Sequence, residues 1–534
     1  MKKIHQIILQ LANDTHNDLN IPLLRFTLLF TLAIGLATYG FGYFNLGFSH
    51  DSLSPALYGQ GIFQLSIGRP FTSFVYCIFE YYNNKPIMGL VSLLFVALSV
   101  YITVNIFSKL LCFEDNKSKK YLTITVSLLY VLNVAFISLN ATYSFQICCD
   151  TLALLCAVLA TYVVCNSIDI KKIFFSVILC TLSIGLYQAY INVFLSLFIV
   201  ILLIKLANGN TALSVIRTGL IYFCIVLFAS VLYLVIWKSL LYLHGINSPQ
   251  IYNNPENIGF TSFEEIAFYI KKSVKHLKNS LIRIDSYNIP IKVLFNIFCV
   301  FILIKAASKI AYKVKGIFGK LLVIVLCILF VLCINIANIV SKNIHHHLMI
   351  FSFCLINVLA FVILLKIKKK IFINTFLIWL TVISFHCSNF YNTISMMKVM
   401  ELDATYSHFS RILQRIESLD DFDSKKDIIV IEPFSKSKYF DNFKNSLFQR
   451  NKVLVGCHSL VAGNYNTDLF ASYFSLGLKT ISLSSNSDLT SLQLSNDQIS
   501  VLNSMDPYPD KSSVKRIGNY IFVKTSTDKY LLNK

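Results

Sequence analysis

Charged side chains are scarce in this chain. Asp, Glu, Lys and Arg make up 14% of its 534 residues, whereas a soluble globular protein carries roughly 25%. Hydrophobic residues account for 55% of the sequence, and they gather in long apolar runs. This composition is typical of an α-helical protein that crosses a membrane several times.

Acidic residues are the scarcer charge, with 27 Asp and Glu against 47 Lys and Arg and a net charge of +20. The excess of bases does not indicate nucleic acid, because most basic clusters occupy short loops between apolar runs, where they orient helices. Bases concentrate in alternate loops, at Lys117 to Lys120, Lys171 and Lys172, Lys205 to Arg217, Lys309 to Lys315, and Lys366 to Lys370. We therefore predict a cytoplasmic N-terminus and an extracytoplasmic C-terminus.

Several common motifs are missing. The sequence has no Walker loop, no GxGxxG that opens a soluble βαβ unit, no HExxH and no paired CxxC. All cysteines except Cys457 lie in or beside apolar runs, so no disulfide framework is expected. These absences argue against a nucleotide-driven pump and against a soluble type of nucleotide-sugar enzyme.

Apolar runs long enough to cross a membrane predict eleven helices and a transmembrane domain over residues 1–389. The runs lie near 22–44, 88–110, 121–138, 147–165, 173–187, 189–206, 218–237, 291–306, 320–340, 348–366 and 371–389. No proline falls inside them, since Pro22 and Pro290 stand at the starts of runs, and this favours unbroken helices. Two extracytoplasmic loops follow from this arrangement, a first loop at 45–87 and a long loop at 238–290 with a helix at 262–283.

The tail from 390 to 534 is richer in charge and has shorter apolar runs. It is long enough to bury a core of its own, and we predict a small extracytoplasmic α/β domain. The expected helices are 401–418 and 441–449, and the expected strands are 427–433, 453–456, 480–483 and 519–525.

The first loop carries the two charged residues that point most directly to chemistry. Asp51 could take a proton from a substrate hydroxyl, although the surrounding Ser-His-Asp-Ser also fits the N-cap of a helix. Arg69 offers a planar fork suited to a phosphate group. The alternative for Arg69 is an interfacial side chain that reaches toward lipid head groups.

Further candidates lie at the predicted outer ends of helices. Asp150 opens an apolar run, where an acid is costly unless it faces water or a polar site. Tyr187 and Gln188 occupy a tight turn and could hydrogen-bond a sugar, although Tyr187 also suits interfacial anchoring. His346 and His347, together with His345, could contact a phosphate or a hydroxyl. Because three adjacent histidines do not converge easily on one ion, we predict no metal site.

Four stretches, in order, resemble the bacterial serotype-converting glucosyltransferases of the Gtr type II family. They are DSLSPALYGQGIFQLSIGRPF, YSFQICCDTLAL, LSIGLYQAYINVF and MDPYPDKSSVKRIGNYIFVKT. The resemblance implies a GT-C membrane glycosyltransferase of the bacterial inner membrane. Such an enzyme moves a hexose, here glucose, from a polyprenyl-phosphate carrier to a surface glycan such as the O-antigen of lipopolysaccharide.

The resemblance also implies roles for residues. Asp51 corresponds to the presumed base of the first loop, Arg69 lies near the donor, and Asp150, Tyr187 and Gln188 line the substrate cavity. The expected partners are the lipid-linked sugar, the glycan acceptor and membrane lipids, with no nucleic acid. No soluble cofactor is expected, and a divalent ion stays open.

The rival functions are an O-antigen polymerase or another membrane transferase, and a transporter for lipid-linked sugars. A transporter should show internal repeats or broken helices with polar residues at midspan. Neither is evident in the sequence, so an enzyme is the favoured interpretation.

Overall fold

The computed structural model describes residues 20–45, 47–49, 52, 61–78, 84–113, 115–246, 262–285, 287–342, 346–425, 427–433, 478–483 and 491–530. By its internal contacts the chain divides into two compact units, each described separately here. The helical unit comprises Met1–Gly40, Gln60–Asn140 and Gln146–Tyr391. The C-terminal unit comprises Phe41–Gly59, Ala141–Phe145 and Asn392–Lys534.

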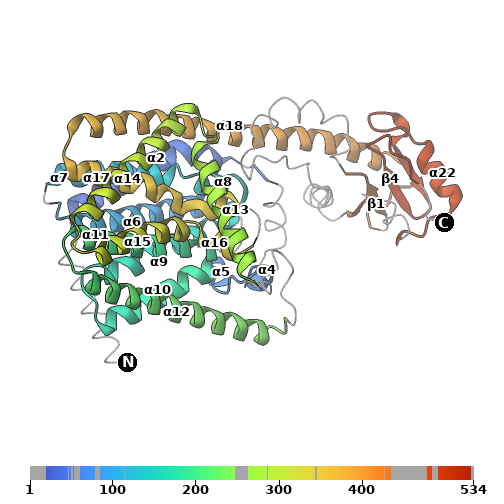
Figure 1. Ribbon diagram of the computed structural model, residues 1–534. Coiled ribbons are helices and arrows are strands. Elements are labelled where there is room, and N and C mark those ends of the chain that lie inside the picture. Colours follow the sequence, from blue (N-terminus) through green and yellow to red (C-terminus); the bar gives the residue numbers. More distant parts are fainter. Residues whose placement is uncertain are drawn as a thin grey trace. The chain divides into compact units, whose positions relative to one another are not determined.

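The helical unit is a bundle of long apolar helices (Figure 1). Helix α9 packs between α6 and α10, α10 also packs on α12, α14 packs on α17, and α11 packs on α15. The helix bounds are α2 (Ile21–Phe44), α4 (Gly61–Ser66), α5 (Thr72–Ile78), α6 (Lys85–Leu111), α7 (Asn116–Val131), α8 (Val134–Thr142), η1 (Ser144–Gln146), α9 (Ile147–Cys165), α10 (Ile170–Leu186), η2 (Gln188–Tyr190), α11 (Ile191–Ala207), α12 (Ala212–Leu243), α13 (Phe263–Ile282), α14 (Pro290–Lys313), α15 (Ile317–Cys333), α16 (Ile336–Val340), η4 (His347–Phe353), α17 (Cys354–Ile367) and α18 (Lys370–Glu417).

Within the described residues, eight helices are long and apolar enough to cross a membrane, or nine if the bent pair α7 and α8 is one span. This establishes a multi-span membrane protein, but the predicted count of eleven is not confirmed. Helices cover the remaining predicted runs as well. However, α10 and α15 have 17 residues each, fewer than the roughly 20 that a full crossing needs.

The prediction of unbroken helices is wrong at the third run. Helices α7 and α8 meet there at an angle of 43°. Asn133 lies at the break, where its Oδ1 accepts a hydrogen bond from the backbone N–H of Ala135 at 2.8 Å. Its Nδ2 donates to the carbonyl of Phe351 at 2.9 Å. An amide side chain can thus satisfy the backbone groups that a break frees, so a helix can bend without proline.

A similar asparagine contact occurs where α15 ends and α16 begins. Asn192 accepts from the N–H of Ala337 at 2.8 Å and donates to the carbonyl of Met349 at 2.9 Å. Asn192 belongs to the first turn of α11, and its side chain is fully buried. Buried asparagines therefore hold the interrupted ends of several helices in place.

The loops and the last predicted span add three findings. The described part of the first loop contains two short helices, α4 and α5, which the sequence did not predict. The helix expected at 262–283 is present as α13. The last predicted span and the separate helix predicted at 401–418 form one continuous helix of 48 residues, α18. Its length of about 72 Å is more than twice the hydrocarbon thickness of a bilayer.

In the described part of the C-terminal unit, four strands form a sheet with the order β2-β1-β4-β3. Strands β1 (Ile428–Ile431), β2 (Lys479–Ser482) and β4 (Tyr520–Val523) run parallel, with β1 in the centre, and β3 (Val514–Ile517) pairs antiparallel with β4. Because side chains alternate across a strand, the two faces of β1 and β4 enter different clusters. Ile429 and Ile521 pack on the end of α18. Val430 and Phe522 pack on α22 (Asn496–Ser504).

The sequence predictions for the C-terminal unit are thus confirmed for the strands at 427–433, 480–483 and 519–525. Strand β3 was missed. The strand predicted at 453–456 and the helix predicted at 441–449 lie outside the described residues, as does Cys457.

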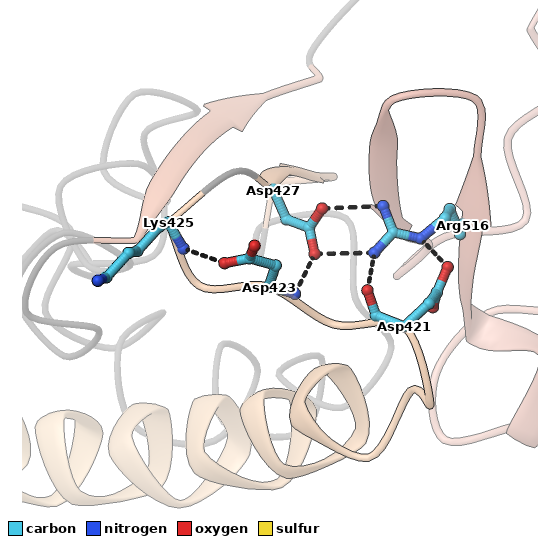
Figure 2. Close-up of polar contacts among 5 residues, drawn as sticks. All are labelled: Asp421, Asp423, Lys425, Asp427 and Arg516. Atoms are coloured by element: carbon cyan, nitrogen blue, oxygen red, sulfur yellow. Dashed lines mark hydrogen bonds and ion pairs between the residues drawn. The ribbon is translucent and has the colours of Figure 1, made fainter.

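An arginine links the segment before β1 to β3 (Figure 2). Arg516 donates from Nη1 and Nη2 to the two carboxylate oxygens of Asp427, each at 2.8 Å. The same guanidinium forms an ion pair with the carboxylate of Asp421 and donates to its carbonyl. Asp427 also accepts from the N–H of Asp423 at 2.7 Å. This bidentate arrangement fixes the chain between α18 and β1 on the sheet.

Candidate functional site

Arg69 is presented by the short connection between α4 and α5. Gly68, directly before it, has φ +87, a backbone conformation that glycine adopts without strain. A Cβ on Gly68 would lie 2.6 Å from Nε2 of Gln188 and 2.8 Å from the hydroxyl of Tyr233. The Arg69 N–H donates to the carbonyl of Gln64 at 2.9 Å. Only glycine fits this turn, and the turn sets the backbone position from which the Arg69 side chain extends.

Three side chains from distant segments hold the connection in place. Gln188 donates from Nε2 to the carbonyl of Gly68 at 2.6 Å, and Tyr233 of α12 donates to the same carbonyl at 2.8 Å. Trp237, one turn further along α12, donates from Nε1 to the carbonyl of Leu65 at 2.8 Å. The amide nitrogen of Gln188 is therefore engaged in positioning the backbone beside Arg69.

The Arg69 guanidinium is half-buried and has few protein partners. Its Nη1 donates to Oε1 of Gln64 at 2.9 Å, and its Cζ lies 4.7 Å from the ring centroid of Tyr187, a cation–π contact. Its Nε is buried and has no hydrogen-bond partner among the described residues. A guanidinium has five N–H donors, so most of them stay available for a ligand. Tyr187 and Gln64 hold the group in one orientation.

Asp150 lies in the first turn of α9 with 3% of its surface exposed. Within the described part of the chain, its carboxylate has neither a hydrogen bond nor an ion pair. The positive charge of Arg69 nevertheless acts on it, and its own charge acts on Tyr190 and Cys149. A carboxylate without partners is costly in an apolar unit, and such residues mark functional sites.

The structure thus brings Arg69, Asp150, Tyr187 and Gln188 together from the α4–α5 connection, from α9 and from the turn between α10 and η2. Their sequence positions span more than one hundred residues. Gln64 and Tyr190 were missed. Gln64 lies five residues before Arg69, and Tyr190 lies three residues after Tyr187, so proximity in sequence was the available signal.

The two described histidines belong to a different part of the helical unit. His346 accepts a hydrogen bond at Nδ1 from the N–H of Leu348, at 3.3 Å, and so caps η4. His347 lies where the charges of Asp285 and Lys292 act on it. Asp51 and His345 lie outside the described residues. Among the residues that are described, no group of three or more His, Cys, Asp or Glu side chains could hold a metal ion.

The fold and the site together define a multi-span helical membrane protein that has, among its described residues, a partly unsatisfied arginine and an unpaired carboxylate at one site. The family model described as "Glucosyl transferase GtrII" matches residues 40–382, and the chain belongs to this family. The resemblance inferred from the sequence motifs is thereby confirmed, and the protein is a member of a glucosyltransferase family. The matched range contains Arg69, Asp150, Tyr187, Gln188, His346 and His347. Neither the curated proteins nor the solved structures yield a match.

Proposed function

We propose that this protein is a GT-C glycosyltransferase that moves a glucosyl group from a polyprenyl-phosphate carrier to a surface polysaccharide such as O-antigen. The reaction takes place on the extracytoplasmic side of the bacterial inner membrane. The observation that carries the proposal is the pairing of GtrII family membership with the Arg69 site. There, a guanidinium with free N–H donors lies near an unpaired carboxylate.

In the proposed reaction, the acceptor hydroxyl oxygen forms a bond to the anomeric carbon of the donor sugar. The bond from that carbon to the carrier phosphate breaks, and the phosphate oxygen leaves with the electron pair. The acceptor proton passes to the carboxylate of Asp51. Arg69 donates to the departing phosphate and stabilises its charge.

The remaining site residues bind the sugar. Asp150, which has no hydrogen bond or ion pair with a described residue, accepts hydrogen bonds from hexose hydroxyls. Tyr187 provides an aromatic face beside Arg69, and Gln188 holds the backbone that presents the guanidinium. His346 and His347, which the sequence suggested as contacts for a phosphate or a hydroxyl, are assigned no step in this reaction. The reaction itself requires no soluble cofactor, and the dependence on a divalent ion is a matter for measurement.

The charge of the short loops supports the proposed side of the membrane. Among the short loops, lysine and arginine concentrate in one alternate set, and such loops face the cytoplasm. The α4–α5 connection, the turn at Tyr187 and Gln188, and the histidines fall in the opposite set. These segments would therefore meet a lipid-linked sugar and a glycan acceptor outside the cytoplasm.

The proposal is tested by comparing surface glycan in cells that carry the wild type, Asp51→Asn, Arg69→Ala or Asp150→Asn at matched protein levels. Arg25→Ala is the control, because Arg25 is an exposed arginine of the same unit. We expect the three site variants to lack one sugar substituent on an intact polysaccharide backbone, and Arg25→Ala to retain it.

Other results would redirect the assignment. Loss of long chains would indicate a polymerase. A normal substituent in Arg69→Ala would remove the phosphate role of Arg69, and a normal one in Asp51→Asn would remove the proposed base. Purified protein that binds a polyprenyl-phosphate glucose but releases it unchanged on the other side of a vesicle membrane would indicate a transporter.

A further inference from the structure

A second cationic side chain, Lys292, lies in the first turn of α14 and has no role in the proposed reaction. Its ammonium nitrogen lies 3.1 Å from the ring centroid of Tyr287. Within the described residues, this nitrogen has no hydrogen bond and no ion pair. An ammonium has three N–H donors, and the face of an aromatic ring satisfies the charge only in part.

Tyr287 is itself firmly held, so the position of Lys292 is defined. The Tyr287 hydroxyl donates to the carbonyl of Leu132, at 2.9 Å, beside the break between α7 and α8. The Tyr287 ring meets Phe390 of α18 edge to face, with centroids 6.0 Å apart. The ammonium is thus supported on one side by a fixed ring.

Three titratable groups from other segments interact electrostatically with Lys292. They are Cys387 of α18, Asp285 in the turn before α14, and His347 at the start of η4. The Asp285 carboxylate is already engaged, since Oδ1 accepts from the N–H groups of Tyr287, at 2.8 Å, and Asn288, at 2.7 Å. Asp285 therefore compensates part of the lysine charge without taking up its N–H donors.

The location of Lys292 is electrostatically unusual. The N-terminus of a helix carries partial positive charge and favours acids in its first turn, whereas lysine is favoured at the C-terminus. In α14 the first turn contains Lys292 and no acid. Both the helix end and the ammonium would be stabilised by a bound anion.

We propose that Lys292, which lies over the ring of Tyr287, forms with His347 a second binding site, which accepts a phosphate group. The ligand class is a phosphorylated lipid, either a polyprenyl phosphate or a phospholipid head group. The inference rests on the proposed function only for the choice of polyprenyl phosphate as a probe. Phosphate binding at Lys292 does not require that sugar transfer occurs.

The first experiment uses the wild-type chain, so it does not depend on a variant that folds. The purified full-length protein, in a phosphate-free maltoside detergent, is acetylated with an amine-reactive ester, and mass spectrometry follows each lysine. Lys305 is the matched internal control. It lies on the same helix, is exposed and forms a similar contact over Phe301, at 4.9 Å.

The probes are a short-chain polyprenyl phosphate, phosphatidylglycerol and inorganic phosphate. We expect a phosphorylated lipid to slow acetylation of Lys292 at least tenfold and to leave Lys305 unchanged. Stronger protection by the polyprenyl phosphate assigns the site to the lipid carrier, and equal or stronger protection by phosphatidylglycerol assigns it to membrane phospholipid. The proposal is overturned if none of the three probes selectively slows acetylation of Lys292.

The second experiment counts sites with a labelled polyprenyl phosphate. The Arg69→Ala variant removes the proposed donor site, so any binding that remains reports Lys292. In this background, we expect Lys292→Met to weaken the remaining binding by roughly tenfold or more, because hydrogen bonds to charged groups are lost. Lys292→Arg should retain most of it and Lys305→Met all of it. If Lys292→Met binds as well as its parent, the proposal fails, whatever the outcome of the transfer assays.

Discussion

The two units of this protein differ in whether their key charged side chains have partners of opposite charge or hydrogen-bond donors. In the C-terminal unit, Arg516 is held by Asp421 and Asp427, and the buried carboxylate of Glu432 accepts from two backbone N–H groups and from the hydroxyl of Tyr530. In the helical unit, Arg69 and Asp150 have no ion pair with any described residue. An ion pair that does occur there, between Lys342 and Glu265, joins partly exposed side chains.

The difference separates structural charges from functional ones. Breaking a satisfied charge removes stability, because it leaves its partner uncompensated. An unsatisfied charge in apolar surroundings already carries that penalty in the folded chain, so its replacement should cost little stability and should remove ligand binding instead. Four substitutions test this contrast, in order of decreasing expected effect.

The largest effect is expected for Arg69→Gln. The rate of glucosyl transfer in the purified protein should fall by about 10² to 10³-fold, the range for losing a donor that stabilises a developing anion. The unfolding temperature should stay near that of the wild type. Arg69→Lys should recover part of the rate, since it keeps the charge but loses the planar fork. An unfolding temperature that drops with the rate would place Arg69 among the structural charges.

Asp427→Asn, unlike Arg69→Gln, should lower stability rather than the rate of transfer. It breaks the bidentate contact with Arg516 and should destabilise the C-terminal unit by about 2 kcal/mol, as expected for a partly exposed, charge-assisted pair. Hydrogen exchange of β1 and β3 in the full-length protein measures this. Asp497→Asn, at an exposed position of α22, is the control. Equal protection in both variants would contradict the structural role of the Arg516 contact.

Gly68→Ala should lower the transfer rate by about tenfold through the position of Arg69. The new Cβ would clash with Gln188 and Tyr233, and alanine at positive φ adds roughly 1 kcal/mol of strain. Gly209→Ala separates the two causes, because Gly209 also has positive φ, +91, yet an added Cβ meets nothing within 4 Å. If both variants lose activity equally, strain alone explains the loss and the contacts of Gln188 are unimportant.

The smallest effect is expected for Ser495→Ala. Ser495 and Gln498 form a reciprocal capping box at the start of α22, and loss of such a cap costs about 1 kcal/mol. Limited proteolysis at increasing temperature, which monitors thermal unfolding of the C-terminal unit, should detect this loss of stability. Glucosyl transfer should stay unchanged. Ser504→Ala, in the last turn of the same helix, should have no comparable effect.

The sequence predicted the helical membrane unit well because long apolar runs need only a count of residues. It also located three of the described strands, since DIIVIEP and NYIFVKT concentrate β-branched and aromatic residues. Strand β3, with the sequence VKRI, was missed because two bases interrupt its apolar residues. Its partner β4 supplies the pairing that defines it.

The broken helices were missed for a different reason. Proline is the local sequence signal for a break in a helix, whereas Asn133 ends α7 through contacts with Ala135 and with Phe351, which is 218 residues away. No local pattern predicts a hydrogen bond over that separation. Lys292 was overlooked for a related reason, because a lysine just inside the start of an apolar run resembles an ordinary interfacial anchor.

By itself the sequence determined the class of the protein, its multi-span helical character and its GtrII family, because composition and motifs are properties of the chain. It also supplied Arg69, Asp150, Tyr187 and Gln188 as separate candidates. Only the tertiary structure decided that these side chains meet and that the Gln188 nitrogen holds the Gly68 backbone. The same structure left Lys292 without an ion pair among the described residues. The physical reason is that hydrogen bonds and electrostatic contacts depend on distances in space, which packing of the helices sets and which the order of residues does not reveal.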